Sequence, residues 1–195
     1  MTHEELPLAT LFRDLLTYLG GRTDAVLFGA QAVNAWCEPP RMTADIDLLS
    51  TNATVLAEQI REHLSSTFHI AMRVREVVPG GFRVYQLQKP KNRHLVDVRQ
   101  VAELPPHRAI DGVQVALPAE LVAMKVVAIA KRAGKVKAIS DRLDLHRLLN
   151  AFEELRDHEG DVTKRLRADG ASEAIVAMWR ELASERIAPD DDEGD

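Results

Sequence analysis

The sequence has little cysteine and no long apolar run. Its single cysteine, Cys37, rules out a disulfide within the chain, and a lone thiol is typical of the reducing cytoplasm, which is the compartment we expect. Cys37 lies among small residues with helical spacing, where packing is favoured over a role as a nucleophile. No stretch is long enough to span a bilayer, and residues 1–7 lack the charged and apolar regions of a signal peptide.

Several well-known site patterns are also missing. CxxC, HExxH, P-loop and GxGxxG patterns do not occur, and the seven histidines are scattered, so a zinc site has little support. The formal net charge of −5 excludes a global attraction to nucleic acid or to an anionic membrane. The 195 residues, 46% hydrophobic and 28% charged, suffice for one globular domain, or for one domain with a helical appendage.

The most informative stretch runs from residue 26 to residue 50. An apolar strand at residues 25–28 ends at Gly29, a short helix follows, and Asp45 and Asp47 come after a Pro-Pro break. Because side chains alternate along a strand, the two carboxylates share one face and repel each other unless a cation lies between them. Mg²⁺ suits such carboxylates together with phosphate oxygens, whereas the alternative is an ordinary solvated acid pair. A helix that begins directly after a strand can hold phosphate, although this is also a common strand-to-helix turn.

Apolar periodicity predicts the remaining secondary structure. Amphipathic spacing predicts helices at residues 8–19, 30–36, 53–64, 119–132, 141–157, 161–168 and 172–188. Alternating or continuous apolar runs predict strands at residues 25–28, 41–50, 69–78, 82–88, 94–101 and 113–115. Residues 189–195 form an acidic tail that we expect to be disordered.

Two charged residues stand out because their surroundings are apolar. Asp97 lies in the middle of the strand at residues 94–101, on the face opposite Val96 and Val98, and a buried acid usually has a partner or a metal. Lys125 lies inside an apolar helix, where it either extends to solvent or meets a negative partner.

A pair of acids follows Lys125 in the chain. Asp141 and Asp144 are three residues apart in the first turn of the helix predicted to be capped by Ser140. The simple interpretation is that these acids complement the helix dipole.

These segments together resemble the AbiEii-type nucleotidyltransferases, a family often found as the toxin half of toxin–antitoxin pairs. The matching motifs are Gly29-Ala30, the helix Gln31–Trp36, the run Arg41-x-Thr43-x-Asp45-x-Asp47, Asp97 in Leu-Val-Asp-Val, Lys125 in its apolar helix, and Asp141-Arg-Leu-Asp144-Leu145. The sequence departs from the family at Ala30, where Gly or Ser is frequent, and at Ser140, where a basic residue is frequent. Ala30 keeps a backbone N–H for phosphate but lacks a hydroxyl.

The resemblance implies an α/β (α+β) nucleotidyltransferase-like fold with a mixed sheet flanked by helices and a C-terminal helical bundle. We expect residues 1–117 to form the nucleotidyltransferase core, residues 118–188 the helical region and residues 189–195 the tail. The implied activity is Mg²⁺-dependent transfer of a nucleoside monophosphate from a nucleoside triphosphate to a hydroxyl group.

The resemblance also implies a role for each site residue. Asp45, Asp47 and Asp97 would be metal ligands and catalytic residues, and Asp97 could accept the proton of the acceptor hydroxyl. Lys125 would neutralise triphosphate charge. The other implied roles are nucleotide binding by Gly29, Ala30, Arg41 and Asp141, and positioning of Lys125 or the acceptor by Asp144, a further catalytic residue.

The acceptor is predicted from basic residues near these segments. They are Arg73, Arg75, Arg83, Lys89, Lys91, Arg93 and Arg99 on the middle strands, and Lys131, Arg132, Lys135 and Lys137 after the Lys125 helix. These basic residues suit an RNA acceptor such as tRNA. The alternative is that they are solvated side chains at strand edges, where lysine discourages aggregation. The protein would then be a toxin with a cognate antitoxin. The alternatives are an enzyme that modifies a small molecule or a protein, and a non-catalytic binding module.

Overall fold

The computed structural model describes residues 7–187, so the predicted acidic tail at residues 189–195 lies outside the described residues. The chain forms two compact units. The first unit comprises Met1–Ala35 and Arg41–Ala116, and the second comprises Trp36–Pro40 and Leu117–Asp195. No helix in the described part of the chain combines the length and the apolar character that a membrane span requires.

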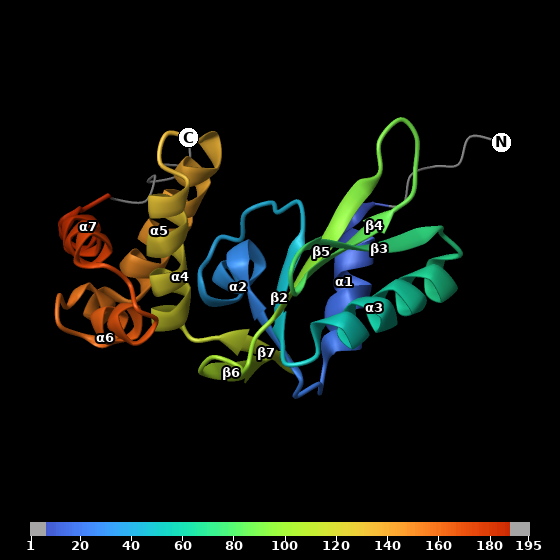
Figure 1. Ribbon diagram of the computed structural model, residues 1–195, viewed down its shortest axis with the longest axis horizontal. Helices are drawn as coiled ribbons and strands as arrows, with labels where there is room; N and C mark the ends of the chain where they lie inside the picture. Colours follow the sequence, from blue (N-terminus) through green and yellow to red (C-terminus); the bar gives the residue numbers. More distant parts are fainter. Residues whose placement is uncertain (1–6, 188–195) are drawn as a thin grey trace, which may run out of the picture. The chain divides into compact units, whose positions relative to one another are not determined.

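The first unit is built on a mixed sheet, in which the described strands follow the order β3-β4-β5-β2-β1-β7-β6 (Figure 1). The strands are β1 (Ala25–Phe28), β2 (Ile46–Ser50), β3 (Met72–Val78), β4 (Gly81–Gln86), β5 (Arg93–Gln100), β6 (His107–Ile110) and β7 (Val113–Ala116). β2 pairs parallel with β5, and β1 pairs parallel with β7; the other neighbours are antiparallel. The predicted mixed α/β architecture is therefore confirmed.

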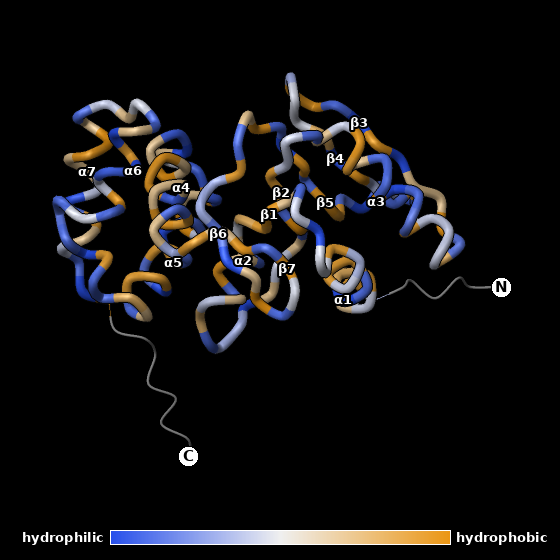
Figure 2. The backbone as a smooth tube through the Cα atoms, turned by 90° about the horizontal axis from the view of Figure 1, so that it is seen from below, coloured by the Kyte–Doolittle hydropathy of each residue, from blue (hydrophilic) through white to orange (hydrophobic). Residues whose placement is uncertain are grey.

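Helices cover one face of this sheet. α1 (Leu8–Leu19) contacts α3 (Ala53–Phe68), and α3 packs on β2, β3, β4 and β5 (Figure 1). Val84, Val96 and Val98 are fully buried in the strands beneath α3. Figure 2 shows the central strands β1 and β2 largely in the hydrophobic colours, as expected for strands in the middle of a covered sheet. The third helix, α2 (Gly29–Trp36), follows β1 without a linker.

The second unit is helical. It contains α4 (Pro118–Lys131), α5 (Val136–Ala151), a 3₁₀ turn at Glu153–Arg156, α6 (Asp161–Ala168) and α7 (Glu173–Ser184). α4 contacts α5, α6 and α7, so it is the central helix of this unit. The Trp179 indole is fully buried and donates a hydrogen bond of 3.0 Å to the Thr163 hydroxyl, which links α7 to α6.

The prediction of the α5 start was wrong. α5 begins at Val136, so Ser140 lies inside the helix and Asp141 lies in its second turn. Gly134, at φ +75°, completes the turn after α4, and Lys135 adopts the extended conformation that precedes a helix. Because no Pro or Gly follows before Ala151, the helix can form from Val136 onward.

Strand β6 was not predicted because its residues are mostly exposed and do not alternate. The signal that could have revealed it is Asp111-Gly112, whose two residues both have positive φ between β6 and β7. An Asp-Gly pair of this kind is typical of a tight hairpin turn.

Candidate active site

The end of β1 places backbone directly against a carboxylate. Phe28 is the register partner of Asp47 in β2, and Gly29 follows with φ +72°. A Cβ added at Gly29 would lie 2.1 Å from Asp47 Oδ2, well inside contact distance. Glycine therefore serves two needs here, since it adopts the left-handed conformation and leaves room for the carboxylate. Ala30 lies in the first turn of α2, where backbone N–H groups have no partner within the helix.

Strand pairing brings a second carboxylate to the same face. Asp47 and Asp97 are register partners in the parallel pair β2–β5, so their side chains lie side by side. Arg83 in β4 is the antiparallel partner of Asp97 and donates a hydrogen bond of 2.8 Å from Nε to Asp97 Oδ1. Arg99 reaches Asp47 Oδ1 at 4.0 Å, and its guanidinium lies 4.9 Å from the Phe28 ring centroid. Each of these two acids is thus close to an arginine.

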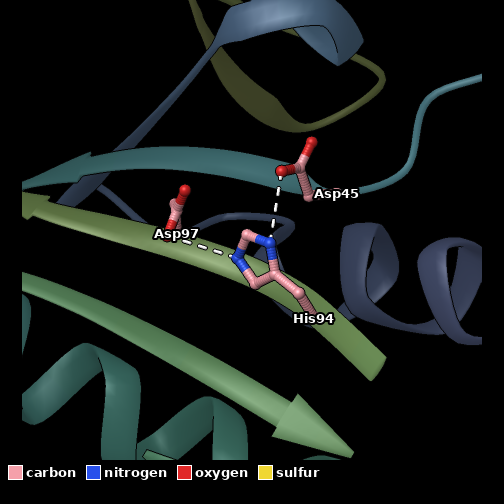
Figure 3. Close-up of side chains that lie close together, drawn as sticks. All are labelled: Asp45, His94 and Asp97. Carbon is pink, nitrogen blue, oxygen red and sulfur yellow. Dashed lines mark ion pairs between the residues drawn. The ribbon is translucent and has the colours of Figure 1, made fainter. Parts of the chain in front are cut away.

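A histidine lies between Asp45 and Asp97 (Figure 3). His94 Nδ1 is 3.4 Å from Asp45 Oδ2, and His94 Nε2 is 3.2 Å from Asp97 Oδ1. Asp45 comes directly before β2, whereas His94 and Asp97 come from β5. One ligand atom from each residue lies within 4.8 Å of the other two, so these three side chains could hold a metal ion. Asp47, which we predicted as a ligand, is not in this group.

The ionisation of this group follows from its contacts. Burial by itself raises the pKa of Asp97, but contact with His94 and Arg83 outweighs burial, so the net pKa lies below its usual value. Burial by itself lowers the pKa of His94, but the carboxylates of Asp97 and Asp45 outweigh it and the net pKa is raised. The site therefore keeps Asp97 ionised and draws positive charge between the carboxylates.

A β-bulge explains how His94 reaches this face. Val84 pairs with Val96, but the next residue of β4, Tyr85, pairs with His94. The additional residue in β5, Leu95, reverses the alternation, so His94 and Asp97 share a face although they are three residues apart. Strict alternation would place them on opposite faces, so His94, which was not among the predicted ligands, joins Asp97 only through the strand register.

The loop before β2 is held at its start by α2. The Arg41 backbone N–H donates to Asn34 Oδ1 at 3.0 Å, and Asn34 Nδ2 donates to the Arg41 carbonyl at 2.7 Å. Arg41 also donates from its guanidinium to the Met42 carbonyl at 3.1 Å. The reciprocal pair between Arg41 and Asn34 anchors the start of the segment that leads to Asp45.

The remaining predicted residues lie in the second unit. Lys125 Nζ donates to Asp144 Oδ2 at 2.6 Å and to Asp141 Oδ1 at 3.1 Å, and Asp141 also pairs with Arg132. The Asp144 side chain is 0% exposed and that of Lys125 is 10% exposed. Two of the sequence-based interpretations are therefore wrong: Lys125 is not a solvated lysine, and the acids do not serve the dipole of a first helical turn. The two buried acids form a charge-balanced cluster with buried Lys125 and part-exposed Arg132.

His146, in the same helix as Asp144, is also buried. Its Nε2 lies 3.0 Å from Glu185 Oε2, and its Nδ1 makes no hydrogen bond within the described residues. Burial is the main cause that lowers the pKa of His146; Glu185 opposes the shift, whereas Arg142 and Arg156 add to it. His146 is therefore held mainly as the neutral imidazole at neutral pH.

Solved structures share this arrangement of sheet and helices. JHP933 from Helicobacter pylori is 15% identical with a TM-score of 0.60, covering 90% of this chain and 88% of that chain. The Megavirus polyadenylate synthase is 12% identical with a TM-score of 0.58, covering 74% of this chain and 31% of that chain. ANT(2'')-Ia, solved in complex with adenylyl-2''-tobramycin, is 14% identical with a TM-score of 0.52, covering 88% of this chain and 96% of that chain. The fold is thus that of the nucleotidyltransferase-like class.

The sequence defines the family within this class. Residues 11–193 match the family described as "Nucleotidyl transferase AbiEii toxin, Type IV TA system". The chain therefore belongs to the AbiEii nucleotidyltransferase toxin family and is a nucleotidyltransferase, as the resemblance of its motifs implied. A comparison with curated protein sequences gave no match.

Proposed function

We propose that the protein is a Mg²⁺-dependent enzyme that transfers a nucleoside monophosphate from a nucleoside triphosphate to a hydroxyl group of RNA, with tRNA as the acceptor. The observation that carries this proposal is the strand pairing of Asp47 with Asp97 beside Gly29, with Asp45 two residues before Asp47 in the chain. Carboxylates of this kind are the ligands that Mg²⁺ prefers. We assign residues 1–117 to the nucleotidyltransferase core and residues 118–188 to a helical region.

Asp45, Asp47 and Asp97 would hold the metal, and bound Mg²⁺ supplies charge stabilisation for an in-line displacement at the α-phosphate. Asp97 is kept ionised by its neighbours and would accept the proton of the attacking hydroxyl. The carboxylates repel a bare triphosphate, so binding of the nucleotide should depend on the cation.

Backbone and lysine donors would bind the phosphates. Gly29 and Ala30 offer N–H groups at the start of α2, and Arg41 lies at the start of the segment that leads to Asp45. Lys125 has three N–H donors, of which Asp141 and Asp144 accept two. We propose that the third donor of Lys125 binds the triphosphate and that the two acids position it.

Charged residues on the exposed sheet face support an anionic acceptor. Arg75 in β3 is the strand-register partner of Arg83 in β4, and Arg83 is the register partner of Asp97 in β5. Their side chains therefore form a row across neighbouring strands, on the face that carries Asp47. α3 packs on the opposite face. Guanidinium groups in a row next to the catalytic carboxylates fit the phosphates of an RNA strand.

The test is incubation with labelled nucleoside triphosphates, Mg²⁺ and total tRNA. Labelled tRNA with the wild type and none with Asp47→Asn is the expected result. Label on a protein or on a small molecule with a free hydroxyl would identify the alternative acceptor. Absence of both transfer and Mg²⁺-dependent nucleotide binding in calorimetry would favour a non-catalytic module.

We further propose that this activity makes the protein a toxin, controlled by a cognate antitoxin and active in the cytoplasm. The family description supports this role. Expression of the wild type should arrest growth, and expression of Asp47→Asn to the same level should not. Equal arrest by both variants would separate toxicity from nucleotide transfer.

A further inference from the structure

We propose that Asp45, His94 and Asp97 form a mixed oxygen–nitrogen metal site, and that His94 makes this site prefer Mn²⁺ to Mg²⁺. The inference rests on the proposed function, because it concerns two of the same three carboxylates, but it adds a ligand and a metal preference. Figure 3 shows the imidazole pointing between the two carboxylates.

The spacing of the donor atoms fits one ion. Metal–ligand bonds of first-row ions are about 2.0–2.2 Å, so two ligands of the same ion lie at most about 4.4 Å apart. His94 Nε2 lies 3.2 Å from Asp97 Oδ1, and the three ligand atoms of the group all lie within 4.8 Å of one another. A side-chain adjustment of a few tenths of an ångström is enough to bring them into one coordination sphere.

The hydrogen bonding of His94 points to Nε2 as the ligand atom. Nε2 is buried, and among the described residues it has no partner with hydrogen-bond geometry, in spite of its closeness to Asp97. Nδ1 instead lies 3.4 Å from Asp45 Oδ2.

The donor set decides the preference. Mg²⁺ is a hard ion that binds oxygen ligands and keeps several waters, whereas an imidazole nitrogen suits transition metals. Mn²⁺ shares the preference of Mg²⁺ for carboxylate oxygens, but as a first-row transition metal it binds an imidazole nitrogen more readily than Mg²⁺ does. Arg83 contacts the same Asp97 oxygen and repels any cation, but its side chain is 41% exposed and can move toward solvent. Arg83 should therefore weaken the binding of both ions equally, whereas His94 should strengthen the binding of Mn²⁺ only.

The test is metal binding by the full chain without nucleotide or acceptor. Mn²⁺ affinity is measured from the loss of the free-ion EPR signal, and Mg²⁺ affinity from competition with Mn²⁺. For His94→Gln we expect Mn²⁺ affinity to fall about tenfold or more while Mg²⁺ affinity changes little. Arg83→Gln should raise both affinities and leave their ratio unchanged. His107→Gln changes a histidine of edge strand β6, away from the site, and should alter neither affinity.

A direct readout does not depend on any variant. Electron spin-echo modulation of Mn²⁺ bound to the wild type should contain the ¹⁴N coupling of an imidazole ligand. Bound Mn²⁺ without this coupling, or an unchanged Mn²⁺/Mg²⁺ ratio in a folded His94→Gln variant, would overturn the proposal even if nucleotide transfer is observed. Nitrogen-coupled Mn²⁺ in a protein that transfers no nucleotide would instead contradict the proposed function alone.

Discussion

The close approach of Gly29 to Asp47 makes Gly29→Ala the sharpest test of the site. The new Cβ would lie 2.1 Å from Asp47 Oδ2, where ordinary contacts begin at 3.4 Å, so the carboxylate or the backbone must shift by roughly 1 Å. A misplacement of about 1 Å in a catalytic group can lower the rate about 100-fold. We therefore expect Gly29→Ala to lower nucleotide transfer by about two orders of magnitude.

The same substitution also strains the backbone. A non-glycine residue held at φ +72° costs on the order of 1–3 kcal/mol, which lowers the melting temperature by about 2–4 °C per kcal/mol in a chain of this size. Gly21→Ala is the matched control, because Gly21 has φ +75° and its added Cβ would meet nothing within 4 Å. Gly21→Ala should lose similar stability from strain but keep its activity.

The assay combines initial rates of nucleotide transfer with thermal unfolding for both alanine variants. A third variant, Gly29→Ala with Asp47→Ala, removes the clashing carboxylate and leaves only the Cβ of residue 47 at 2.9 Å, so it should recover part of the stability but none of the activity. If Gly29→Ala and Gly21→Ala transferred nucleotide at similar rates, the contact between backbone and carboxylate would not matter for catalysis.

Three further predictions follow from the described contacts. Asp47→Ala should abolish transfer and leave the melting temperature unchanged or higher, since it removes a repelling carboxylate; full activity would refute the metal proposal. Lys125→Met leaves fully buried Asp144 without its 2.6 Å partner, so the free energy of unfolding in urea should fall by about 3–5 kcal/mol, and adding Asp144→Leu should restore part of it; an unchanged urea midpoint would contradict the pairing. His146 has a lowered pKa when folded, so the unfolded chain binds more protons just below the ordinary value of 6.5. Stability should therefore fall as pH drops from about 7 to 5, and His146→Gln should reduce this slope in urea titrations, whereas an equal slope in both proteins would exclude His146 as its source.

Much of the sheet and its acids could be predicted from local sequence. Alternation placed Asp97 on the face opposite Val96 and Val98, and the structure has both valines buried and pairs Asp97 with Asp47. Alternation carries this information because successive side chains of a regular strand point to opposite faces. The order of the motifs was enough to indicate the family, since each motif lies on its own short element.

Other features arose only when distant segments met. The partners of Lys125 lie 16 and 19 residues further along the chain, and the sequence does not show whether a lysine in an apolar helix meets solvent or an acid. The start of α5 was misjudged because Ser140 before an acid looks like a helix cap, although nothing prevents the helix from starting earlier. Contacts between helices decided the first point, whereas the second follows from the absence of Pro and Gly between Val136 and Ala151.

His94 shows most clearly where sequence reasoning ends. Its distance of three residues from Asp97 predicts opposite faces, and only the register shift opposite Tyr85 turns it toward Asp45 and Asp97. A bulge depends on how two strands hydrogen-bond to each other, so it cannot be predicted from the sequence of either strand alone. The sequence by itself therefore determined the acids, the glycine turn and the order of the elements. The tertiary structure decided which charged side chains contact one another, because those contacts depend on strand register and on the packing of helices.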